Sequence, residues 1–266
     1  MNKKMIITFV AGCLLAAAAP AEVLTTAKKL FADKADAVVW VTGVAKITFS
    51  AAESKDGGVN LPDDETKVEA LATFVDTNGL AVTILSQLDP SRALSGRSLR
   101  TASGPVKVEA VSTLKEVKIV MPDGLEIPAE LILKDVDLDL AVLRLKTASK
   151  EAKGVFINAI DLNDSAVGHI LDETVTLSRM DEVFNRVPNV FVGQVNMVTQ
   201  KPRVFLRATG ATAGCPTFNA EGKILGITTG RYVKGKSPAA AIMPAADVLE
   251  LLGQIKPAAP DASATK

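Results

Sequence analysis

Short runs of alternating apolar and polar residues, separated by turn residues, are the feature that most constrains the fold of this chain. The clearest pair, residues 117–121 and 125–131, flanks the turn sequence Pro122-Asp123-Gly124. Alternation with a period of two indicates strands, and a short turn between two such runs predicts a β-hairpin. Many short strands joined in this way favour an all-β barrel over a sheet built from βαβ units.

Helical spacing of apolar residues occurs near the two ends of the chain. Residues 24–34 are predicted to form a short amphipathic helix, and residues 37–41 to begin the first strand. A second helix is expected at residues 246–255, followed by a small-residue tail at 256–266 that we expect to be disordered. A length of 266 residues is compatible with one domain, since all-β barrels reach this size.

The first 21 residues have the pattern of a signal peptide. Asn2-Lys3-Lys4 is a positively charged start, residues 5–19 are apolar, and Ala19-Pro20-Ala21 is a small-residue cleavage site. We therefore expect export, to the periplasm or by secretion, with a mature chain that begins near Glu22 and has no transmembrane span. As an alternative, the sequence Val-Ala-Gly-Cys that ends at Cys13 resembles a lipobox and would make Cys13 a lipid anchor.

Three segments resemble the motifs of one enzyme family. Residues 211–216 read Ala-Thr-Ala-Gly-Cys-Pro and resemble the G-x-S-G-G-P loop of the trypsin-like serine proteases, with Ala213 at the nucleophilic serine. Residues 74–88 are similar to the histidine segment of the HtrA branch of that family and place Ser86 at the histidine. Residues 137–145 are similar to the family's S-D-L-A-V-L-K-I and place Asp139 at the orienting aspartate.

The order of these segments agrees with the resemblance, because the chymotrypsin-type arrangement runs His, Asp, Ser along the chain. With further matches at residues 192–195 and 241–244, the resemblance spans roughly residues 35–254. It implies two six-stranded antiparallel β-barrels, at about residues 36–147 and 155–245, with the closing helix at about 246–255. The residues after this helix are too few for the PDZ domain of most HtrA proteins, so we expect the protease-fold domain alone.

The same alignment predicts a proteolytically inactive protein, a pseudoprotease. A methyl group at Ala213 cannot attack a carbonyl, and Ser86 cannot serve as the general base. The resemblance places the oxyanion loop at Ala211, Thr212 and Ala213, and a non-glycine residue at 211 opposes the backbone conformation needed there. No residue is therefore expected to be catalytic.

An alternative is a peptidase or other hydrolase with unorthodox residues, such as Ser86 or Cys215. After signal cleavage Cys215 is the only cysteine, so it forms no intramolecular disulfide. It either fills a packed turn as a small apolar residue or acts as a nucleophile beside a base. His169, the single histidine, lies in a segment that aligns with no catalytic motif.

Binding of a peptide or protein needs no triad. The resemblance places the family's substrate-pairing edge at Ile227, Thr228, Thr229 and Gly230, and an extended peptide could add a strand there. A further alternative is a structural or regulatory subunit of an active protease, suggested by the arginines within residues 90–113, a segment that is otherwise expected to be a solvated loop. The oligomeric state stays open.

Composition and motifs exclude several other functions. The 30 basic and 30 acidic residues balance, so neither nucleic acid nor an anionic membrane surface is an expected partner. The triplet Asp135, Asp137, Asp139 resembles the start of a calcium loop, but Leu140 replaces the required glycine. With one histidine and no cysteine pair a zinc site is not expected, and no glycine-rich phosphate loop is present, so we expect neither a metal nor a cofactor.

Overall fold

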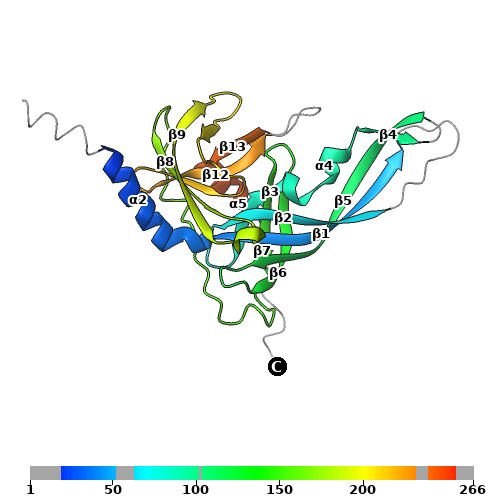
Figure 1. Ribbon diagram of the computed structural model, residues 1–266, viewed down its shortest axis with the longest axis horizontal. Helices are drawn as coiled ribbons and strands as arrows, with labels where there is room; N and C mark the ends of the chain where they lie inside the picture. The colour runs from blue at the N-terminus through cyan, green and yellow to red at the C-terminus, as the bar shows by residue number, and fades with distance from the viewer. Residues whose placement is uncertain (1–18, 52–62, 102–103, 232–238, 256–266) are drawn as a thin grey trace, which may run out of the picture.

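The computed structural model describes residues 19–51, 63–101, 104–231 and 239–255 and contains two antiparallel β-barrels side by side (Figure 1). Most of the expected signal peptide, the segment 52–62 and the expected tail lie outside these residues. No helix in the described ranges is long and apolar enough to cross a membrane.

The first barrel is a closed ring of six strands. In chain order they are β1 (Val38–Ala51), β2 (Asp64–Phe74), β3 (Leu80–Ile84), β5 (Gly104–Val120), β6 (Glu126–Asp135) and β7 (Leu140–Leu145). Neighbours follow the order β1-β2-β3-β7-β6-β5, and pairing of β1 with β5 closes the ring. The predicted hairpin is confirmed between β5 and β6, where Asp123 accepts the Leu125 amide and Gly124 has a φ of 88°.

The second barrel is also a closed ring of six antiparallel strands. They are β8 (Glu173–Arg179), β9 (Pro188–Val198), β10 (Leu206–Ala208), β11 (Pro216–Asn219), β12 (Ile224–Arg231) and β13 (Ala239–Pro244), in the order β10-β13-β12-β11-β8-β9. The double-barrel fold predicted from the motifs is therefore confirmed.

The expected terminal helices are both present. Helix α2 (Ala19–Lys34) packs against β8 and β9 and is followed by a 3-10 turn, η1 (Ala35–Ala37). Helix α5 (Ala245–Leu252) packs against β12 and β13. A second 3-10 turn, η2 (Glu182–Phe184), lies in the β8–β9 connection.

The segment 90–113 is not the solvated loop that the sequence suggested. It forms helix α4 (Ser91–Leu94), strand β4 (Ser98–Thr101) and the first part of β5, and helix α3 (Leu85–Leu88) precedes it. The strands β1 and β5 run on together as a long arm, with β4 against β5 (Figure 1). Apolar side chains that face inward, such as Val108 and Ala110, explain the extra strand length.

One hydrophobic core is shared by the two barrels and α2. Leu71, Val82 and Leu140 from the first barrel meet Leu177, Ile227 and Met243 from the second, and Val23, Ala27 and Leu30 of α2 join the same cluster. A separate cluster fills the first barrel. Because each fully buried aliphatic side chain contributes roughly 1.5–3 kcal/mol, the shared cluster holds the barrels as one unit.

Candidate functional site

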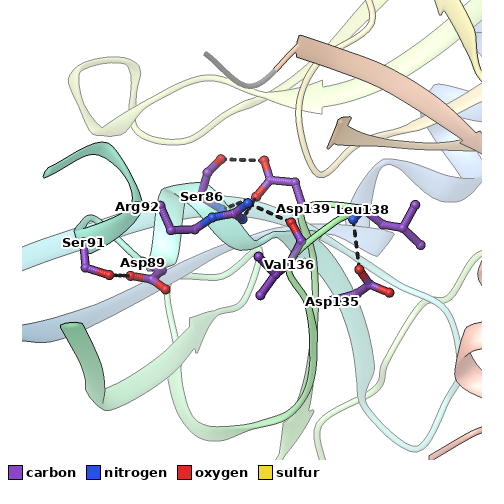
Figure 2. A network of polar contacts seen from close by, with 8 residues as sticks. All are labelled: Ser86, Asp89, Ser91, Arg92, Asp135, Val136, Leu138 and Asp139. Atoms are coloured by element: carbon purple, nitrogen blue, oxygen red, sulfur yellow. Dashed lines mark hydrogen bonds and ion pairs between the residues drawn. The ribbon is translucent and has the colours of Figure 1, made fainter. Parts of the chain in front are cut away.

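The two triad-equivalent positions of the first barrel meet in space (Figure 2). Ser86 lies in α3, directly after β3, and Asp139 lies just before β7 with a φ of 51°. The Ser86 hydroxyl donates to Asp139 Oδ2 at 2.7 Å, and the Ser86 amide donates to Asp139 Oδ1 at 2.8 Å. The hydroxyl of Ser86 thus occupies the place beside the aspartate that the resemblance gives to the histidine.

Arg92 of α4 completes the surroundings of this aspartate. Its guanidinium forms an ion pair with Asp139 Oδ1 and also donates to the Val136 carbonyl at 2.8 Å (Figure 2). Asp139 is fully buried and the Arg92 side chain is 9% exposed. Burial raises the pKa of the Asp139 carboxyl above its ordinary value, while the Ser86 hydrogen bond and the Arg92 charge oppose this shift.

Strand β12 closes over the same carboxylate at Gly230. A Cβ atom on Gly230 would lie 2.2 Å from Asp139 Oδ2, so only glycine permits this approach. Asp139 therefore contacts α3, α4 and the second barrel at once. This environment gives the carboxylate a structural role that does not depend on a histidine.

The loop that carries Ala213 is clamped between the barrels. Gly214 has a φ of 77°, and a Cβ there would lie 1.9 Å from the Leu71 carbonyl oxygen of β2. The Gly214 amide donates to the Thr228 carbonyl at 2.8 Å, and its own carbonyl accepts the Thr73 hydroxyl at 2.7 Å. The second half of the loop is thus fixed by β2 and β12.

Two amides of this loop form local backbone hydrogen bonds. The Ala211 amide donates to the Ala208 carbonyl at 3.3 Å, and the Cys215 amide donates to the Thr212 carbonyl at 3.0 Å. An oxyanion hole needs amides that are free and converge on one point. At Ala211 the amide is instead part of a turn.

Cys215 is buried within the shared core and is not positioned to react. Burial raises the pKa of its thiol to about 12, and its Sγ lies 3.6 Å from Ser178 Oγ. Since the thiolate is the nucleophilic form, this thiol is inert at neutral pH. His169 lies on an exposed loop beside Asp172, with 3.4 Å between Nδ1 and Oδ2.

The residues of the expected peptide edge differ in their backbone pairing. Ile227 lies between Pro216 of β11 and Met243 of β13, and the Thr228 amide donates to Cys215 on the β11 side. The register of β11 with β12 ends at Ile227, whereas β13 continues beside β12 to Arg231. Successive residues of a strand direct their amides to opposite sides, so Gly230, like Thr228, directs its backbone groups away from β13.

A pocket of about 570 Å³ lies beside this edge. Its lining residues come from β9, β10, β12, β13 and the first half of the Ala213 loop: Asn196, Arg207, Ala208, Thr209, Gly210, Ala211, Thr228, Ala240, Ala241 and Ile242. Thr228 is fully buried, and its hydroxyl has no hydrogen-bond partner among the described residues.

The acidic triplet does not form a metal site. Asp135 accepts the Leu138 amide at 2.9 Å within a turn, and Asp139 is paired with Arg92 (Figure 2). Across the described parts of the chain, no group of three or more His, Cys, Asp or Glu residues could hold a metal ion.

The sequence analysis singled out Ser86, Asp139 and Ala213 as candidate site residues but missed the role of Arg92. The only available signal was an arginine six residues after Ser86. Thr73 and Leu71, which hold the Ala213 loop, gave no sequence signal because their contacts are made by a side chain and a carbonyl across the barrel interface.

Comparison with solved structures finds the same fold in serine protease domains. A serine endoprotease from Yersinia pestis matches with a TM-score of 0.52 and 17% identity over 85% of this chain and 65% of the other. A variant of the HtrA-type protease AlgW, solved with a tripeptide, matches with a TM-score of 0.49 and 16% identity over 84% of this chain and 61% of the other. The protease domain of MamO from Magnetospirillum magneticum matches with a TM-score of 0.47 and 18% identity over 84% and 98% of the two chains.

At these identities the likeness shows the fold. This chain spans about two thirds or less of the length of the Yersinia and AlgW chains. No protein-family model matches the chain, and comparison with curated proteins finds no match.

Proposed function

Since the chain has the double-barrel fold of the HtrA-type, trypsin-like serine proteases, we propose that it is a proteolytically inactive member of that fold group which binds an extended peptide segment. The observation that carries the loss of proteolysis is the pairing of Asp139 with Ser86 and Arg92 where a histidine would be needed. Alanine at position 213 removes the nucleophile as well. In serine proteases, loss of the nucleophile or of the base alone costs on the order of a million-fold in kcat.

The oxyanion loop supports the same proposal. With the Ala211 amide bonded to Ala208, little of the residual stabilisation that survives loss of the triad is available. The buried, protonated thiol of Cys215 argues against the alternative of a cysteine nucleophile.

Peptide binding is proposed from the geometry of β12. Gly230 directs its amide and carbonyl away from β13, beyond the end of β11, and the 570 Å³ pocket lies next to it. A peptide added as a strand would pair with these groups, and one of its side chains would enter the pocket. The signal-peptide pattern of the first 21 residues leads us to propose that this binding takes place outside the cytoplasm.

The activity half of the proposal is tested with a fluorophosphonate probe and a casein digestion. We expect neither labelling nor digestion by the folded protein, with an active serine protease assayed in parallel. A second comparison is a restored variant that carries Ser86→His, Ala211→Gly, Thr212→Asp, Ala213→Ser and Cys215→Gly. Labelling of the unaltered protein, lost in Ser86→Ala, would show that Ser86 is a working nucleophile and that the proposal is wrong.

The binding half is tested by a screen of random extended peptides, followed by hydrogen exchange of the complex. We expect exchange of the Gly230 amide to slow when peptide binds. The Ile227 amide, which lies in a strand paired on both sides, is the internal control and should not change. A screen without any saturable ligand would contradict this half.

A further inference from the structure

The pocket beside β12 has a positively charged wall. Small side chains form much of its wall, and Arg207 is the one charged residue among its described lining residues. The ion pairs found among the described residues do not include Arg207. The pocket thus presents a positive charge with no neighbouring carboxylate in its wall.

Local strand geometry explains how Arg207 reaches this position. Along β10 it is exposed between buried Leu206 and Ala208, so its side chain points out of the barrel. The register with β9 shifts between Arg207 and Ala208, because Asn196 is an extra residue opposite them. Such a β-bulge turns side chains away from the regular alternation, and here it sets Asn196 beside Arg207 in the pocket wall.

A second polar group in the pocket lacks a partner. Thr228 is 0% exposed, and its hydroxyl has no hydrogen-bond partner within the described ranges. A buried hydroxyl without a partner carries a free-energy cost, and Thr228 forms part of the pocket wall. The guanidinium of Arg207 offers only donors, and the Thr228 hydroxyl can donate as well.

We propose that this pocket selects an acidic side chain, Asp or Glu, of the bound peptide, with Arg207 as the specificity-determining residue. The carboxylate accepts hydrogen bonds from the Arg207 guanidinium, whose planar fork matches its geometry. Thr228, two residues before Gly230 on β12, lines the pocket, so a strand added at Gly230 would run beside the pocket wall. This selectivity rests on the proposed peptide binding at β12.

The test uses four pools of labelled seven-residue peptides whose central residue is Glu, Gln, Leu or Lys and whose other positions are random. Fluorescence anisotropy with the full chain is expected to show about tenfold tighter binding of the Glu pool than of the Gln pool, the effect of one partly exposed charge-assisted pair. Raising the salt concentration should reduce this ratio, because surface charges are screened.

Charge variants assign the effect to one residue. Arg207→Met should remove the preference for Glu over Gln, and Arg207→Glu should shift the preference to the Lys pool. Arg203→Met alters an exposed arginine outside the pocket lining and should leave the preference unchanged. Circular dichroism of each variant verifies the fold.

The outcomes separate the two proposals. Equal binding of all four pools, unchanged by Arg207→Met, would overturn the acidic selectivity and leave peptide binding at β12 standing. Binding of no pool, together with no slowing of exchange at Gly230, would overturn the peptide-binding proposal and the selectivity with it.

Discussion

At the scale of single residues, the candidate site is centred on a buried carboxylate and the arginine that pairs with it. Ser86 carries no charge that could neutralise the buried carboxylate of Asp139, and the positive charge comes from Arg92, four residues after the end of α3. A buried carboxylate without such a partner would carry a large desolvation cost. The guanidinium of Arg92 therefore offsets part of the cost of burying the Asp139 charge.

The raised pKa of Asp139 predicts a specific dependence of stability on pH. Because the folded-state pKa lies above the ordinary 3.8, the folded state binds the proton more tightly than the unfolded state does. The contribution of Asp139 to stability is then complete below pH 3.8 and is lost as the pH rises through its folded-state pKa.

Urea unfolding of the protein and of Asp139→Asn, at pH values from about 3 to about 7, tests this dependence. The unfolding free energy of the unaltered protein should fall relative to that of the Asn variant as the pH rises. A difference that stays constant or grows with pH would mean that Arg92 and Ser86 outweigh the desolvation of the carboxylate.

Two glycines have the same φ but different surroundings, so substitutions at them distinguish the cost of steric overlap from the cost of backbone strain. Gly214 and Gly96 both have a φ of 77°, but a Cβ on Gly214 would overlap the Leu71 carbonyl, whereas one on Gly96 meets nothing within 4 Å. We expect Gly96→Ala to cost about 1 kcal/mol of unfolding free energy and Gly214→Ala to cost more than about 3 kcal/mol. Chemical denaturation measures both, and similar losses would show that the Ala213 loop can move away from β2.

At the scale of elements, helix α2 joins the second barrel through one of its faces. Val23, Ala27 and Leu30 are buried in the shared core, and the Thr26 hydroxyl donates to the Ala220 carbonyl at 2.7 Å. The sequence predicted a helix over residues 24–34 from the spacing of its apolar residues. Its packing partner was not predicted, since β8 and β9 begin more than a hundred residues later.

A matched pair of substitutions tests this packing. Leu30→Ala should lower the unfolding free energy by about 2–4 kcal/mol, because it leaves a cavity in the core. Leu24→Ala, on the same helix at a side chain that is 52% exposed, should change it by less than about 0.5 kcal/mol. Equal effects in urea denaturation would show that α2 contributes only its local stability.

At the scale of the whole molecule, the shared core makes the two barrels one cooperative unit. Trp40, the single tryptophan, is on β1, and its indole nitrogen donates to the Met180 carbonyl, just beyond β8, at 2.8 Å. Arg179 spans the same interface, with hydrogen bonds to the Val38 carbonyl and to Asp36. Separation of the barrels would break these contacts and expose the cluster around Leu71 and Ile227.

We therefore expect coincident unfolding transitions by three probes: tryptophan fluorescence, far-UV circular dichroism and alkylation of Cys215 in a Cys13→Ser variant. The buried thiol, with a pKa of about 12, should react only when the core opens. Alkylation at urea concentrations that leave the circular dichroism unchanged would show that the barrels part before they unfold.

The sequence by itself determined the double-barrel fold and the terminal helices. These features are local: strand alternation, turn chemistry and short motifs in a set order are each contained in a few consecutive residues. The β5–β6 hairpin could be predicted from its turn for this reason, whereas the assignment of Ser86, Asp139 and Ala213 to the triad positions stays a prediction from the motifs.

Only the tertiary structure decided what surrounds those residues. Four features join residues that are distant in the chain or lie on different elements. They are the ion pair of Arg92 with Asp139, the close approach of Gly230 to Asp139, the contacts of Leu71 and Thr73 with the Ala213 loop, and the pocket at Arg207. Their physical reason is the burial of one core between two closed barrels. That burial brings β2, α4 and β12 together. It also removes the Asp139 carboxylate from solvent, so that its hydrogen-bond partners are protein groups.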